Sequence, residues 1–255
     1  MKTNVITRII VYSLLIVFLV GLLLTCLGVG AFMFNLGFGT DEYNTGSGTV
    51  SATDIRNLDI DWAAGSVTIT TAETDHITFT ESGNFSDDYA MIFNAKNGTL
   101  SVEYSKPSVW IGFGSTPSKD LTITVPEDWD CDSLEIDGAA LNISITGLSV
   151  DTIELDGASM KLSFNGSFDK LDCDGASCKL NLVTSQKPHE IDIDGASCHV
   201  DVTLPYGCGF LAQMEGLGSD FDADVEYSRG NGSYSYGDRY CQINMDGLSC
   251  SLRIH

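Results

Sequence analysis

Basic residues are scarce in this 255-residue sequence: 13 lysines and arginines stand against 35 aspartates and glutamates, a formal net charge of −22. Segment 1–40 holds Lys2 and Arg8 and no acid, so the remainder of the chain, with two fewer basic side chains than the whole, is more acidic still. Such a surface repels nucleic acid and anionic lipid headgroups. We therefore expect no nucleic-acid partner, and we expect cationic partners or divalent metal ions to be favoured.

Catalytic motifs are also missing. The sequence has no Gly-x-Ser-x-Gly, no phosphate-binding loop and no Cys-x-x-Cys, and its four histidines lie in no nucleophile or metal motif: His76, His189, His199 and His255. Carboxylates are so regularly repeated that no pair is singled out as general acid and base. The sequence predicts a protein that is not an enzyme and has no cofactor. A polysaccharide-acting enzyme is the least favoured alternative.

Charge is absent from residues 9–34. At about 1.5 Å per residue this stretch exceeds the roughly 30 Å hydrocarbon core of a bilayer. Lys2 and Arg8 precede it, so the positive-inside rule places residues 1–8 in the cytoplasm and the rest of the chain outside. We predict a single-pass transmembrane helix. One alternative is a cleaved signal peptide, but the apolar run is longer than the apolar region of a typical signal peptide. Another is a lipoprotein cleavage site at Cys26, but Thr25 is an unfavourable residue directly before the cysteine of such a site.

Only five prolines occur, against 26 glycines, and no helical period is present after the apolar stretch. Residues 35–52 are rich in Gly, Ser and Thr and are predicted to form a flexible linker. Residues 53–255 alternate polar and apolar residues, as half-buried strands do. Candidate strands lie at 76–80, 89–94, 99–104 and 121–125, with a hairpin turn at Asn97-Gly98.

A short phrase of the form Ile-Asp-Gly-Ala-Ser recurs from residue 134 onward. Its aspartates are Asp137, Asp156, Asp174 and Asp194, at nearly constant intervals, and a fifth copy contains Asp246. Each repeat reads as a strand, a bend at the glycine, a second strand and a turn. Units this short must stack to bury a face. We predict an all-β, parallel β-solenoid-like domain with about 19 residues per repeat, and we call one repeat a rung.

Equivalent positions of stacked rungs align into columns. Two inward columns contain cysteines in place of Leu, Ile and Met: Ile136, Leu155, Cys173, Ile193 and Met245; and Leu141, Met160, Cys178, Cys198 and Cys250. The cysteines are therefore interpreted as small buried apolar residues. Cys178 and Cys198 lie on adjacent rungs, but parallel neighbours in register rarely offer the dihedral angle of a disulfide.

Two outward columns are acidic. One contains Asp59, Glu135, Glu154, Asp172, Asp192 and Asn244; the other contains Asp61, Asp137, Asp156, Asp174, Asp194 and Asp246. Stacked like charges repel. A hard cation such as Ca²⁺, or a cationic peptide or polymer, would offset the repulsion. The structural alternative, which we favour, is that each Asp caps its own bend as in an Asx turn while the other column is solvated.

Two loops are candidate recognition elements. Residues 105–119 contain Trp110 and Phe113 among Gly, Ser and Pro. Residues 227–240 contain Tyr234 and Tyr236 in a Tyr/Ser/Gly/Asn mixture typical of antibody paratopes. For the second loop we favour another role, covering the open end of the stack. An end left open could pair with a second copy, so self-association is an expectation as well.

Three features together resemble a known family. They are the N-terminal apolar span, the opening Leu-Asp-Ile-Asp-Trp-Ala-Ala-Gly-Ser-Val-Thr-Ile at residues 58–69 with Leu-Thr-Ile-Thr-Val-Pro at 121–126, and the repeated Asp-Gly-Ala-Ser phrase. They resemble the bacterial "putative adhesin" β-strand-repeat proteins, also called toastrack domains. The resemblance covers residues 53–255. Members often carry Ser-Gly where this chain has Ala-Ser at the bend, a change that should leave the fold unaltered.

The resemblance implies a right-handed solenoid-like fold displayed outside the cytoplasmic membrane, with a link to surface adhesion or envelope sensing. It implies no catalytic residues. We expect a non-enzymatic, membrane-anchored module that binds a protein or glycan ligand at the cell surface. The alternative is a regulatory accessory of other membrane proteins in the envelope stress response.

Overall fold

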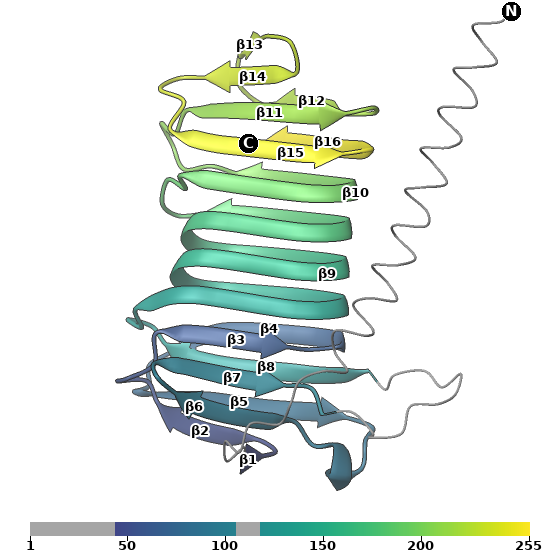
Figure 1. The fold of residues 1–255 in the computed structure, drawn as a ribbon. Helices are drawn as coiled ribbons and strands as arrows, with labels where there is room; N and C mark the ends of the chain where they lie inside the picture. Colours follow the sequence, from purple (N-terminus) through teal and green to yellow (C-terminus); the bar gives the residue numbers. More distant parts are fainter. Residues whose placement is uncertain (1–43, 106–117) are drawn as a thin grey trace, which may run out of the picture. The chain divides into compact units, whose positions relative to one another are not determined.

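The computed structural model describes residues 44–105 and 118–255. The segments in which polar and apolar residues alternate form β-strands. Within these residues the chain forms strands β1 to β16 and a single 3₁₀ turn, η1 (Asp87–Tyr89). Strand pairing is mostly parallel in the centre of the domain (Figure 1). The prediction of an all-β fold built from stacked, mostly parallel strands is confirmed.

The central rungs stack in the register that the repeat predicts. Strand β9 (Cys131–Thr184) is 54 residues long and winds through successive rungs (Figure 1). It pairs in parallel with β3 (Asn57–Asp61) and β4 (Ala64–Ala72) below and with β10 (Glu190–Thr203) above. The next rung is formed by β15 (Cys241–Gly247) and β16 (Ser249–Ile254), which pair in parallel with β10. The matched repeats therefore lie one above another.

The N-terminal end of the stack is antiparallel. Here β2 (Gly48–Ser51) pairs with β5 (His76–Gly83), β5 with β8 (Lys119–Pro126), β1 (Asn44–Thr45) with β6 (Ile92–Lys96), and β6 with β7 (Thr99–Glu103). The β6–β7 hairpin turns at Asn97 and Gly98, whose φ angles of 54° and 86° belong to the left-handed region that an Asn-Gly turn uses. Parallel pairing of β7 with β3 and of β8 with β4 joins this end to the rungs.

The C-terminal end closes in a similar way. Strand β11 (Phe210–Gly216) continues the parallel stack on β15, and β12 (Asp220–Ala223) continues it on β16. Beyond β11 the chain reverses into β14 (Ser233–Tyr236) and β13 (Ser228–Arg229), which are antiparallel. Antiparallel segments thus cover both ends of a parallel stack, which leaves only short edges for pairing with another chain.

Three sequence predictions need correction or qualification. Residues 44–51, assigned to the flexible linker, contain β1 and β2, because Val50 packs against the core and anchors β2 on β5. The candidate strand at 89–94 begins later, at Ile92, after the 3₁₀ turn. The predicted transmembrane helix at 9–34 and residues 35–43 lie outside the described residues. In the described ranges no helix is long and apolar enough to cross a membrane.

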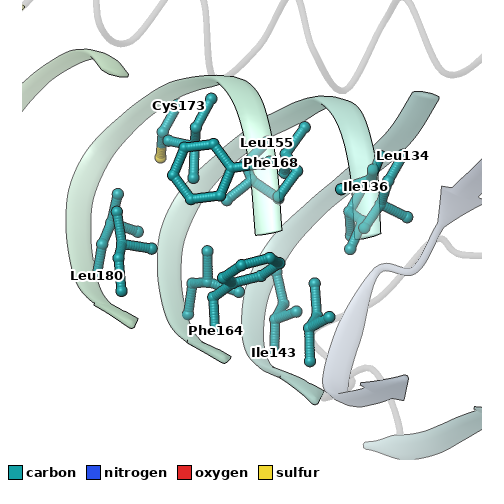
Figure 2. Close-up of a cluster of buried hydrophobic side chains, with 14 of the residues drawn as sticks. Leu134, Ile136, Ile143, Leu155, Phe164, Phe168, Cys173 and Leu180 are labelled. Atoms are coloured by element: carbon teal, nitrogen blue, oxygen red, sulfur yellow. The ribbon is translucent and has the colours of Figure 1, made fainter. Parts of the chain in front are cut away.

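Each rung has two extended segments joined by the glycine bend, and the core lies between them. Figure 2 shows Leu134, Ile136 and Leu155, from the segments before the bends of β9, facing Ile143 and Phe164, from the segments after them. The inward columns are almost fully buried, with Ile136, Cys173 and Ile193 at 0% exposure. Burying one such aliphatic side chain contributes roughly 1.5–3 kcal/mol. Two opposed faces are left pointing outward, and they are the candidate surfaces for function.

Candidate binding face

Acidic residues follow one face of the stack in register. The first column runs through Asp59, Glu135, Glu154, Asp172 and Asp192, and the second through Glu103, Asp61, Asp137, Asp156, Asp174, Asp194, Asp246 and Glu215. We call these two columns the acidic face. Neither contains a basic residue. All five candidate aspartates, Asp137, Asp156, Asp174, Asp194 and Asp246, lie in the second column.

The pairing shows that this column is longer than the repeat phrase indicated. Glu103 of β7 pairs with Asp61, and Glu215 of β11 pairs with Asp246. The columns predicted from the sequence included neither residue, because neither is followed by the Gly-Ala-Ser bend; Met214-Glu215-Gly216 is a degenerate copy of the repeat phrase. Their polar positions in alternating strands, Val102-Glu103 and Met214-Glu215, are the signal that could have found them. The acidic face therefore extends from the N-terminal end of the stack to the C-terminal end.

The carboxylates of the acidic face repel one another. Partial burial, followed by the charges of Glu135 and Asp156, raises the pKa of Asp137 to about 6. The pKa values of other carboxyls on this face are also raised, by burial first and by neighbouring carboxylates second; they are Glu135, Asp172, Asp174, Asp192 and Asp194. The fold holds these groups together at an electrostatic cost. A cationic ligand would relieve that cost.

The bend beside each aspartate has a different explanation from the one predicted. A Cβ on Gly157 would lie 2.2 Å from the carbonyl oxygen of Gly138, and a Cβ on Gly195 would lie 2.2 Å from that of Gly175. Glycine is needed because the backbones of successive rungs approach closely. Within the described residues no side chain of the five aspartates makes a hydrogen bond to its own bend. The Asx-turn interpretation is wrong here, and the aspartates point outward.

The opposite face of the same rungs carries mixed charges. Lys179, His199 and Ser251 occupy one column, and Asn181, Asp201, Arg253 and Asp222 occupy the next. Arg253 forms an ion pair with Asp222 at 3.3 Å in this second column, and the ring of His255, next to the column, lies 3.1 Å from Asp201. A hydrogen bond to Asp224 raises the pKa of His255. We call this surface the mixed face; its charges are largely compensated.

The described residues contain no group of three or more His, Cys, Asp or Glu side chains arranged to hold a metal ion. A shallow depression of about 310 Å³ lies elsewhere, lined in part by Arg56, Asp130 and Trp129. Arg56 there donates hydrogen bonds to Asp132 and Asp130, and Trp129 Nε1 donates to the carbonyl of Ile55. The polar side-chain groups of Arg56 and Trp129, which line the depression, are therefore already hydrogen-bonded within the protein. The acidic face therefore remains the candidate site among the described residues.

All seven cysteines of the described residues are buried and unbridged. Cys178 and Cys198 are paired neighbours, as predicted, and both side chains lie in the core. Cys173 Sγ lies 3.2 Å from Cys178 Sγ, inside one rung. Burial raises the pKa values of Cys131 and Cys241 to about 12. The cysteines therefore behave as apolar core residues, as the columns predicted.

The two candidate loops differ in what the structure describes. Trp110 and Phe113 lie outside the described residues. Tyr234 is 8% exposed and stacks on Phe221 with ring centroids 4.0 Å apart, while Tyr227 and Arg229 contact its ring. Tyr236 is 39% exposed. The 227–240 segment forms β13 and β14 over the last rungs, and its aromatic cluster leaves Tyr236 more available for contacts than Tyr234.

One further exposed feature adjoins the acidic face. Leu217 and Leu248 are 91% and 49% exposed and directly follow the paired glycines Gly216 and Gly247. In earlier copies of the phrase the place of Leu248 is taken by alanine, as at Ala196. That change from Ala to Leu is the signal in the sequence for this exposed feature. Leu248 follows Asp246, and Leu217 follows Glu215, by two positions each.

The chain also matches a known family of β domains. Residues 55–215, well over half of the chain, match the family described as Toastrack DUF4097. The chain belongs to this family, and the family resemblance stated from the sequence is confirmed. No curated protein matches the chain.

Solved bacterial structures are similar over most of their length. A "putative cell adhesion protein" from Clostridium sporogenes is 15% identical with a TM-score of 0.48, covering 84% of this chain and 99% of that chain. A "putative adhesin" from Bacteroides fragilis is 8% identical with a TM-score of 0.36, covering 85% and 98%. A "putative lipid binding protein" from Parabacteroides distasonis is 12% identical with a TM-score of 0.29, covering 84% and 98%. At these identities and scores the likeness carries no functional argument.

Proposed function

We propose that this chain is a non-enzymatic adhesin-like surface module whose acidic face binds a cationic protein or peptide. Residues 9–34 would anchor it in the cytoplasmic membrane with the β domain outside, and the stacked rungs would form a right-handed β-solenoid. The observation that carries the proposal is the pair of acidic columns in register, without a basic residue in either. Such a surface raises the local concentration of cations and accelerates their encounter with the protein.

The exposed leucines suggest the kind of partner. Leu217 and Leu248 adjoin the C-terminal end of the acidic face. A segment carrying lysines or arginines and one apolar side chain would match both features. Central apolar contacts generally supply affinity, whereas charges around them supply association rate and specificity.

The test is binding of a short oligolysine peptide to the full chain, measured by calorimetry at low and at physiological salt. We expect binding that weakens as salt screens the charges, and an Asp174→Asn/Asp194→Asn double variant that binds about tenfold less tightly, a loss of about 1.4 kcal/mol. The matched control, Asp87→Asn/Asp88→Asn, removes the same charge from the exposed η1 turn. Equal losses in both variants would reduce the effect to net charge and contradict the proposal.

The proposed display outside the membrane has its own test. In intact cells, a membrane-impermeant amine reagent should label exposed lysines such as Lys161 and Lys170. Labelling only after the membrane is permeabilised would overturn this part of the proposal, while leaving the binding face unaffected.

A further inference from the structure

A lysine and a glutamate form a fully buried ion pair at the N-terminal end of the stack. Lys119 begins β8 and takes an inward position in the series that continues with Leu121 and Ile123. Its side chain is 0% exposed, and the side chain of Glu81 on β5 is 2% exposed. Lys119 Nζ lies 2.7 Å from Glu81 Oε1. The two residues occupy the core side of neighbouring antiparallel strands, in a diagonal arrangement.

Aromatic rings enclose this pair. Lys119 Nζ lies 4.2 Å from the ring centroid of Tyr104, 4.6 Å from that of Phe85 and 5.9 Å from that of Trp62. Lys119 Nζ also donates to the carbonyl oxygens of Tyr89 and Ser105. The rings keep water away from the amine, and the backbone carbonyls fix its direction.

The glutamate is held just as firmly. The backbone N–H of Met91 donates to Glu81 Oε2 at 2.7 Å, so the two carboxyl oxygens have different partners. Oε1 of Glu81 faces the Lys119 amine, and Oε2 faces a hydrogen-bond donor. Burial, followed by the charge of Glu81, raises the pKa of the neighbouring Tyr104, whose hydroxyl therefore stays protonated.

Stability alone does not account for the pair. Removing two charges from water costs several kcal/mol per ion, and apolar residues of similar volume often serve as well or better. Yet Lys119 stands in a position that the alternation of β8 assigns to an apolar side chain. The geometry favours chemistry between the two groups, because the side-chain carboxyl carbon of Glu81, Cδ, lies within about 4 Å of Lys119 Nζ, given a C–O bond of about 1.2 Å.

We propose that Lys119 and Glu81 condense to an intramolecular isopeptide bond that covalently joins β8 to β5. Transfer of one proton from the ammonium to the carboxylate gives a neutral amine and a carboxylic acid. The amine Nζ attacks Cδ, and the Met91 N–H stabilises negative charge that develops on Oε2, in the manner of an oxyanion hole. The Cδ–Oε1 bond then breaks, Oε1 takes a second proton from Nζ, and water leaves.

The enclosure favours both the rate and the product. Groups held in contact react with effective molarities of about 10⁵–10⁸ M, which offsets the reluctance of a free amine and acid to condense. The product is a neutral amide, so the cost of two buried charges disappears. The bond would fasten the antiparallel end of the domain, the end nearest in sequence to residues 1–43.

Mass spectrometry of the full chain tests this without any substitution. We expect an intact mass lower than the sequence mass by one water. Trypsin would then be unable to cleave after Lys119, and the peptide 57–96 would be recovered joined to 97–161. Full sequence mass, with 57–96 and 97–119 recovered as separate peptides, would overturn the proposal.

Two variants and a matched control sharpen the result. In Glu81→Gln the same attack releases ammonia in place of water, so the mass deficit should change to that of one ammonia. Lys119→Met should have no deficit. The control pair is Lys170 and Glu190, which lie 3.3 Å apart but are 51% and 37% exposed; Lys170→Met should retain the deficit of one water. If the deficit disappears in Lys170→Met and persists in Lys119→Met, the assignment to Lys119 is wrong.

Discussion

The central rungs carry mutually repelling carboxylates on the acidic face and compensated charges on the mixed face. On the acidic face, Asp174 and Asp194 stack in register with raised pKa values. On the mixed face, Arg253 stands between Asp201 and Asp222 and lies 3.3 Å from Asp222. Both faces share one core and one bend, so the fold does not require the repulsion. The difference supports the proposal that the acidic face binds a cationic partner, for which the mixed face has no comparable excess of charge.

The largest effect should come from the bend that joins the two faces. Alanine at Gly195 would place a Cβ 2.2 Å from the Gly175 carbonyl oxygen, a contact that only a backbone shift can relieve. We expect Gly195→Ala to lower the free energy of unfolding by about 3 kcal/mol, measured by chemical unfolding. Ser197→Ala, at an exposed position nearby on the same rung, is the control and should stay within about 0.5 kcal/mol. Equal stability of both variants would refute the close-approach explanation of the glycine column.

A smaller effect, of opposite sign, is expected on the acidic face. The pKa of Asp137 is about 6 in the folded chain, raised from an ordinary value of 3.8. The folded state therefore binds more protons between these values, and the free energy of unfolding falls as pH rises from about 4 to about 6. Asp137→Asn should stabilise the protein by about 1 kcal/mol at pH 7, after allowance for solvent screening, and should have no such effect at pH 4. A loss of stability at both pH values would contradict the repulsion.

The smallest effect is expected on the mixed face. Arg253 and Asp222 form an exposed ion pair, with side chains 53% and 63% exposed. Such pairs contribute little because water and salt screen them. We expect Asp222→Asn to change the free energy of unfolding by less than about 0.5 kcal/mol at any salt concentration. A larger loss would show that the charges of this face are structural, and the contrast between the faces would weaken.

The periodic part of the molecule could be predicted and the irregular part could not. Successive rungs repeat the same side-chain pattern, so the columns through Ile136 and Asp137 follow from the sequence once the register is known. Glu103 could not be assigned to its column, because the antiparallel N-terminal end interrupts the repeat. Glu215 was left out because its copy of the phrase, Met214-Glu215-Gly216, is degenerate. The same interruption hid β1 and β2 in a Gly/Ser/Thr-rich segment.

Two misjudgements have a common physical cause. The Asp-Gly dipeptide suggested a local Asx turn. The glycine is instead required by the close backbone of the neighbouring rung, which is distant in sequence. Residues 105–119 were predicted to form a loop, whereas Lys119 begins β8 and enters the core, where Glu81 on the separate strand β5 compensates its charge. In both places the decisive contact is non-local, and no pattern within a short window contains it.

The ionisation of the acidic face can be followed directly by NMR, through the side-chain carboxyl resonances of Asp137, Asp174 and Asp194. We predict midpoints above the ordinary aspartate value in the free protein, and midpoints that move downward when oligolysine peptide is added, because a bound cation favours the charged form. Midpoints at the ordinary value that do not respond to the peptide would contradict the claim that this face is a binding surface for a cationic partner.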